Sequence, residues 1–222
     1  MPYQNDRING GKKVTDVAQL NSIPLSRKVA LVSIMTALAL VGSYVFIAIP
    51  NVELGSVVLF ITGLVFGIEI GLATMLISAV IFSMINPWGA AVPIILLSQV
   101  IAWAIIVITG YLVSLNKTPE RYKQLYLGVL GFLVTLIFDL ITNLGYSIGF
   151  SIPYSIALAT GLPYLVVHVI SNTIIFSQGI PPIERIIRDN LSTSIWEQSI
   201  DTSLSLQDDE IEGEIITRRH LD

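Results

Sequence analysis

One long apolar run constrains the fold more than any other feature of the chain. Residues 52–86 are apolar almost throughout, and apart from Glu53 at the edge the only charge among them is Glu69. A single helix of this length would extend about 50 Å, whereas the hydrocarbon core of a bilayer is about 30 Å thick. Because Gly67 and Gly71 bracket Glu69, we predict a tight hairpin there, with a short helix on each side.

The rest of the chain contains further runs that are long enough to span a membrane. They are residues 29–49, 91–114, 125–147 and 153–177. Only 13% of the residues are charged and the mean hydropathy is +0.75, whereas about a quarter of a soluble domain is charged. We therefore predict an all-α integral membrane protein of the cell membrane, a bundle of six transmembrane helices.

The basic residues predict how this bundle is oriented. With six helices, all 12 Lys and Arg residues fall on the side of the two termini, and the loops on the other side contain none. The positive-inside rule then places both termini in the cytoplasm. We predict a cytoplasmic segment over residues 1–26, a membrane domain over 27–190 and a disordered acidic cytoplasmic tail over 191–222. Residues 180–189 are predicted to form a short interfacial helix after the last span.

Asp139 is the clearest ionisable residue inside a predicted span. A charged side chain at the centre of a span costs roughly 2.5–3.5 kcal/mol on insertion scales. Asn143 and Tyr146 follow Asp139 at helical spacing, so the three side chains share one face. This stripe either fastens helices together or faces a ligand, and its course toward the outer mouth favours a ligand.

Other polar and aromatic residues are predicted at the same outer end. Gln99 and Trp103 are spaced i, i+4, and Trp103 suits a pocket wall. The outer joints supply Asn51, Glu53, Asn86 and Trp88, although Trp88 also fits an interfacial anchor. His168 and Asn172 share a face of the last span, where a histidine is commonly a hydrogen-bonding partner between helices.

Several classes of chemistry are not indicated. The chain has no cysteine, and no Ser–His–Asp, HExxH, GxSxG or Walker-type pattern is present. One histidine among scattered carboxylates does not predict a metal site. The spacing of Gly55, Gly63, Gly67 and Gly71 indicates close helix contact. We expect no enzyme, no cofactor, no metal and no nucleic-acid partner.

Four stretches resemble the S components of energy-coupling factor (ECF) vitamin transporters. They read "IPNVELGSVVLFITGLVFGIEIG", "INPWGAAVPIILLSQVIAW", "FDLITNLGYSIGF" and "GLPYLVVHVISNTIIF". The resemblance covers residues 29–188. It implies a membrane subunit without an ATPase of its own, which captures a vitamin from outside. It further implies association with a transmembrane T component and two cytoplasmic ATPases. By resemblance alone, cobalamin or a precursor is the first candidate ligand.

The resemblance also assigns residues. Ligand contacts in the family come from the outer loops and the outer halves of later helices, which here match Asn51, Glu53, Asn86, Trp88, Gln99, Trp103, Asp139, Asn143, Tyr146 and Tyr154. Many members carry AxxxA in the first span, where small residues let the T component approach. Here the corresponding small pairs are Ser33–Ala37 and Ala39–Ser43, so the strict pattern is missing.

A second function stays open. Asp139 and His168 could act as relay groups in a proton- or ion-coupled secondary carrier. Such carriers often contain inverted repeats, and no convincing repeat relates the two halves of this chain.

Overall fold

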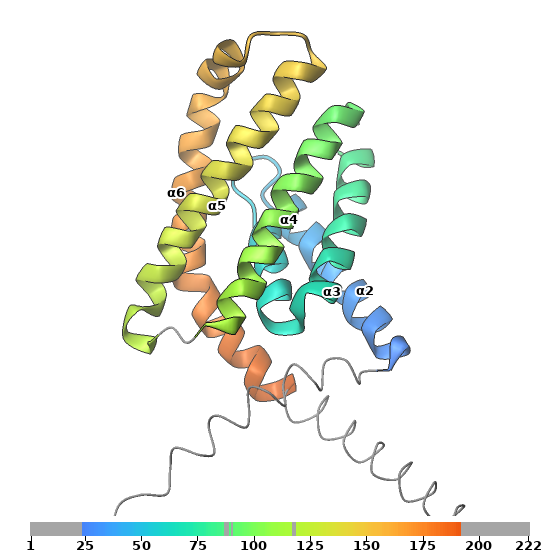
Figure 1. Ribbon diagram of the computed structural model, residues 1–222, viewed down its shortest axis with the longest axis vertical. Helices are drawn as coiled ribbons and strands as arrows, with labels where there is room; N and C mark the ends of the chain where they lie inside the picture. Colours follow the sequence, from blue (N-terminus) through green and yellow to red (C-terminus); the bar gives the residue numbers. More distant parts are fainter. Residues whose placement is uncertain (1–23, 87–88, 90, 117–118, 192–222) are drawn as a thin grey trace, which may run out of the picture. The chain divides into compact units, whose positions relative to one another are not determined.

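The structure is a computed structural model that describes residues 24–86, 89, 91–116 and 119–191. Within these ranges it contains no β-strand. The helices are α2 (Leu25–Tyr44), α3 (Gly55–Met84), α4 (Pro93–Leu115), α5 (Glu120–Gly149) and α6 (Tyr154–Leu191), shown in Figure 1. All 5 are long and apolar enough to cross a membrane. Residues 25–184 form one compact unit, and this unit contains the features described below.

Proline marks where several of the helices begin. Pro93 is the first residue of α4, Pro119 precedes α5 and Pro153 precedes α6. Proline suits these positions because its φ matches the first helical turn, where its missing N–H is not needed. The observed bounds lie within one or two turns of those predicted, except that α6 continues to Leu191. It thereby includes residues 180–189, which we predicted as a separate interfacial helix.

Helix α3 is broken at the predicted place. Gly67 has φ 85° and ψ 178°, which is not helical. A Cβ placed on Gly71 would lie 3.2 Å from the Cα of Gly63, whereas residues eight apart in a continuous helix are about 12 Å apart. The chain therefore turns back within α3, as Figure 1 also shows.

This break explains why the structure describes 5 such helices where we predicted six. Residues 55–66 and 68–84 are the two limbs of α3, and both are shorter than the roughly 20 residues that span a bilayer. The number of membrane crossings and the side of the termini stay predictions. The predicted N-terminal segment and acidic tail lie almost entirely outside the described residues.

Glycines let neighbouring helices approach closely. A Cβ on Gly63 would overlap the carbonyl of Val107 in α4, and a Cβ on Gly110 would overlap the carbonyl of Phe60 in α3. These reciprocal contacts bring the backbones of α3 and α4 together, which is the packing role that we predicted for Gly63. Between α5 and α6, Gly131 provides similar room for the ring of Phe176, which is fully buried.

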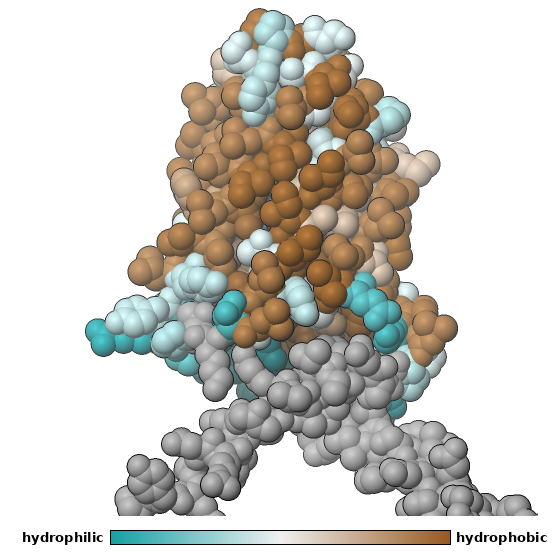
Figure 2. Space-filling model, viewed as in Figure 1, coloured by the Kyte–Doolittle hydropathy of each residue, from teal (hydrophilic) through white to brown (hydrophobic). Residues whose placement is uncertain are grey.

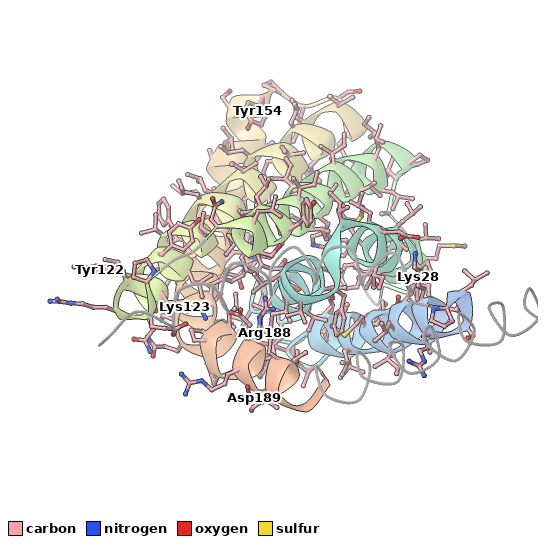
Figure 3. The ribbon with its side chains drawn as sticks, turned by 60° about the horizontal axis from the view of Figure 1, so that its bottom comes forward. Lys28, Tyr122, Lys123, Tyr154, Arg188 and Asp189 are labelled. Carbon is pink, nitrogen blue, oxygen red and sulfur yellow. The ribbon has the colours of Figure 1, made fainter. Side chains whose placement is uncertain are left out.

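The two ends of the compact unit differ in charge. Lys28 near the start of α2 pairs with Glu69 at 2.7 Å, and Lys123 near the start of α5 lies 3.3 Å from Glu184. Figure 3 shows Lys28 and Lys123 away from Tyr154, which begins α6. Apolar side chains cover most of the helical face in Figure 2, and hydrophilic ones gather where α2 and α5 begin. This pattern suits a bundle surrounded by lipid.

Candidate functional site

A cavity of about 660 Å³ lies toward the ends of α2, α3 and α5, whereas Lys28 and Lys123 lie near the starts of α2 and α5. It is formed where α2, α3 and α5 end and where α4 and α6 begin, together with the segment that joins α2 to α3. Most of the residues predicted to bind a ligand line it: Asn51, Glu53, Asn86, Gln99, Trp103, Asp139, Asn143 and Tyr146. Its volume falls within the range of about 300–1,000 Å³ that is usual for small-molecule sites.

Helical spacing explains why these residues meet. On α5, Asp139, Asn143 and Tyr146 form the predicted stripe, and all three face the cavity. On α4, Gln99 and Trp103 lie one turn apart on the same wall. Gln99 also accepts a hydrogen bond from Ser83 at 2.8 Å, which ties the end of α3 to the start of α4.

Three ionisable side chains meet at the cavity wall. Nδ1 of His168 on α6 lies 2.9 Å from Oδ1 of Asp139 on α5. Nε2 of the same ring lies 3.9 Å from Oε1 of Glu53. The side chains of His168 and Asp139 are 4% and 5% exposed. A buried carboxylate is stabilised only when it is paired or hydrogen-bonded, so this arrangement accounts for two acids in an otherwise apolar bundle.

Glu53 is the member of this group that lies outside the helices. Burial alone raises the pKa of its carboxyl group, but contact with His168, the charge of a protonated His168 and the Ser56 amide lower it by more. The net pKa of Glu53 is therefore below its ordinary value. Both of its oxygens accept from the backbone N–H of Ser56 at 3.2 Å, so Glu53 also satisfies the first turn of α3.

Residues 45–54, here called the strap, contribute one side of the cavity. The strap turns sharply at Asn51, whose φ is 58°. The hydroxyl of Ser171 on α6 donates to the carbonyl of Asn51 at 3.4 Å, and the amide of Leu54 donates to the carbonyl of Gly42 at 2.9 Å. The Ser171 bond and the Glu53–His168 contact hold the strap against α6, and the Leu54–Gly42 bond holds it against α2.

Aromatic rings form a continuous row along the cavity. The ring centroids of Phe82 and Trp103 are 5.7 Å apart, those of Trp103 and Phe138 are 6.1 Å apart, and those of Phe138 and His168 are 5.6 Å apart. All four side chains line the cavity. Such a row offers a broad apolar surface to a planar ligand.

Two of the predicted ligand-binding residues are not seen at the cavity. Tyr154 is not among the lining residues, and its hydroxyl donates to the carbonyl of Leu140 at 3.0 Å, which fixes the start of α6 against α5. Trp88 lies outside the described residues. Asn172, which shares a helical face with His168, donates to Thr135 at 3.1 Å and fastens α5 to α6.

Sequence reasoning missed some residues of the cavity wall. His168 was interpreted as a link between helices, yet it both links α5 to the strap and lines the cavity. Tyr164, one turn before it, lines the cavity as well. For His168, the available sequence signal of a role at the cavity was its position as an ionisable residue within an apolar run. Phe82 and Phe138 carried no signal that separates a cavity wall from lipid contact.

The small residues of α2 divide into two groups. Ser33 and Ala37 are exposed, so they remain available to a partner helix. Ala39 and Ser43 are buried, and a Cβ on Gly55 would overlap the Ser43 hydroxyl. The Ala39–Ser43 pair therefore packs against the start of α3, which corrects its predicted place in a docking face.

Comparison with known protein families identifies the family of this chain. A family model described as "ECF-type riboflavin transporter, S component" matches residues 25–178. No curated protein and no solved structure matches the chain. The family model names riboflavin, so cobalamin is not retained as the first candidate ligand. The chain belongs to the ECF-type riboflavin transporter S component family, and it is a multi-pass membrane protein that serves as a substrate-capture subunit and not as an enzyme.

Proposed function

We propose that the cavity binds riboflavin, or a flavin closely related to it, and that the chain captures this ligand from outside the cell. The observation that carries this proposal is the row of Phe82, Trp103, Phe138 and His168 along a cavity of about 660 Å³. A flavin ring system is planar and largely apolar, with polar groups along one edge. Stacked rings and a few placed polar groups suit such a ligand.

The proposed orientation rests on the positive-inside rule. Lys28 and Lys123 lie near the starts of α2 and α5, whereas the cavity lies toward the ends of these helices. With basic residues on the cytoplasmic side, the cavity faces outward. The strap then stands at its mouth, and Asn51 and Glu53 belong to a ligand gate.

The proposed partners are a transmembrane T component and two cytoplasmic ATPases. S components of this type have no ATPase of their own, and energy for uptake comes from the associated subunits. Ser33 and Ala37 are the exposed small residues of α2, and small side chains allow close helix approach in a membrane. We assign the contact with the T component to this part of α2.

Titration of the purified full-length protein with riboflavin tests the proposed ligand. We expect saturable binding at one-to-one stoichiometry, with quenching of flavin fluorescence as the ring stacks on the aromatic row. Absence of saturable binding would overturn the proposal. Uptake by cells adds a second test, because uptake that needs no ATPase and collapses with a proton uncoupler would favour a secondary carrier.

A further inference from the structure

Three buried polar atoms on residues of the cavity wall have no hydrogen-bond partner within the described part of the chain. They are Oδ2 of Asp139, Nε1 of Trp103 and Nε2 of His168. The His168 atom faces Oε1 of Glu53 at 3.9 Å, whereas Asp139 and Trp103, each 4% exposed, have no such neighbour for these atoms among the described residues. A buried polar atom without a hydrogen bond is costly. Because both residues line the cavity, a ligand in that cavity can supply the missing partners.

Several other polar atoms of this wall already have hydrogen-bond partners within the fold. Oδ1 of Asp139 is taken by His168, Oε1 of Gln99 accepts from Ser83, and Nδ2 of Asn143 donates to the carbonyl of Asp139 at 2.8 Å. Oδ2 of Asp139 and Nε1 of Trp103 are a buried acceptor and a buried donor that a ligand can pair, whereas Nε2 of His168 faces Glu53. An ionised carboxylate can only accept and an indole N–H can only donate, so a ligand that pairs both atoms presents an N–H and a separate acceptor.

The proposed flavin function, on which this inference rests, supplies such a ligand edge. The pyrimidine part of a flavin carries one N–H, at N3, between two ring carbonyls. We infer that Asp139 accepts a hydrogen bond from flavin N3–H and that Trp103 donates one to a neighbouring ring carbonyl. Asp139 and Trp103 thereby become specificity-determining residues that select a planar heterocycle with an imide edge.

The aromatic row supports this arrangement. Phe138 lies between Trp103 and His168 in the row, and His168 is hydrogen-bonded to Asp139. A flavin that stacks on Phe138 therefore has Trp103 and the His168–Asp139 pair as neighbours, and the proposal places its imide edge toward both.

The test compares riboflavin with N3-methylriboflavin, which lacks the N–H but keeps the ring and both carbonyls. Dissociation constants are measured by fluorescence titration of the full-length protein in detergent. We expect the wild type to bind N3-methylriboflavin at least tenfold more weakly, since one missing hydrogen bond of about 1.4 kcal/mol corresponds to tenfold. Equal affinity for the two flavins would overturn the inference while leaving riboflavin capture intact.

Two variants separate hydrogen bonding from steric exclusion of the methyl group. Asp139→Leu keeps the bulk of the side chain but has no acceptor, so the preference for riboflavin should fall to less than threefold. A preference that persists in Asp139→Leu would overturn the role of Asp139. Trp103→Phe keeps an aromatic ring without the N–H, and we expect both flavins to bind at least fivefold more weakly while the preference remains. Unchanged affinity in Trp103→Phe would overturn the role of Trp103.

Thr109→Val is the matched control, because Thr109 also lies on α4 but is not among the residues that line the cavity, and its hydroxyl donates to the carbonyl of Ile105 in the same helix. Its preference for riboflavin should equal that of the wild type, and loss of the preference would overturn the assignment to Asp139. If the wild type binds neither flavin, the proposed function itself fails. The wild-type comparison needs no variant, so the inference can be tested even where Asp139→Leu does not fold.

Discussion

Asp139 on α5 and His168 on α6 lie with Oδ1 and Nδ1 2.9 Å apart, and both side chains are almost completely buried. This contact links two helices at the cavity wall and places His168 between Asp139 and Glu53. Removal of one partner from a buried pair costs about 3–5 kcal/mol, because the other partner is left uncompensated. The pair is therefore central to both the fold and the site.

We predict strong coupling between these two residues. Asp139→Asn and His168→Gln should each destabilise the protein, and the double variant should lose less than the sum of the two. Coupling in such a cycle is typically about 0.5–3 kcal/mol. Thermal unfolding of the full-length protein in detergent gives the four stabilities, and strictly additive effects would contradict a direct interaction.

Phe138 and Phe132 provide a matched pair on α5. Phe138 lines the cavity, whereas Phe132 is 44% exposed and is not among the lining residues. Phe138→Ala should weaken riboflavin binding at least tenfold, which corresponds to about 1.4 kcal/mol, because a stacking ring is lost. Phe132→Ala should leave affinity within about twofold in the same fluorescence titration. Similar losses in both variants would indicate a general effect on α5.

Glu53 and Glu69 are acidic residues in different environments: Glu53 faces His168 at the cavity wall, whereas Glu69 is exposed. Glu53→Gln removes the charge that faces His168 and weakens the bonds from Ser56, so we expect a loss of about 1.5–3 kcal/mol of stability. Glu69→Gln breaks an exposed pair with Lys28, and such pairs contribute about 1 kcal/mol or less. Thermal unfolding at neutral pH compares the two variants, and the larger loss should belong to Glu53→Gln.

The depressed pKa of Glu53 adds a pH dependence to this comparison. A lowered folded-state pKa contributes stability above the ordinary carboxyl pKa of about 4.3, and that stability is lost as pH falls through the folded-state pKa. The difference in stability between the wild type and Glu53→Gln should therefore shrink on acidification. A difference that grows at acid pH would contradict the assigned direction of the pKa shift.

Gly67 and Gly179 test the turn in α3. Gly67 has φ 85° and ψ 178°, a conformation open essentially to glycine alone, so Gly67→Ala should cost about 1–3 kcal/mol. Gly179 lies in a helix, and a Cβ there would meet Ile175 at an ordinary 3.6 Å. Gly179→Ala should be neutral or stabilising. Equal unfolding temperatures for the two variants would indicate that α3 does not turn at Gly67.

The sequence was sufficient for the parts of the fold that depend on local pattern. Apolar length predicted the helices, and Gly67 with Gly71 around Glu69 predicted the turn in α3. Helical spacing placed Asp139, Asn143 and Tyr146 on one face, and all three line the cavity. The number of membrane-spanning helices was harder to predict, because the limbs of α3 are shorter than a usual span.

Contacts between distant segments were not predictable in the same way. The position of His168 between Asp139 and Glu53 depends on how α5, α6 and the strap pack. Tyr154 has an aromatic ring and a hydroxyl, as a ligand contact requires, yet it bonds the backbone of α5. Ala39 and Ser43 resemble an open small-residue face until the start of α3 packs over them.

A structure of the full-length protein with riboflavin bound tests the central claim most directly. We expect the flavin ring system inside the cavity, stacked along Trp103 and Phe138, with its imide edge toward Asp139. Density for the ring outside this cavity, or an empty cavity at saturating riboflavin, would contradict it.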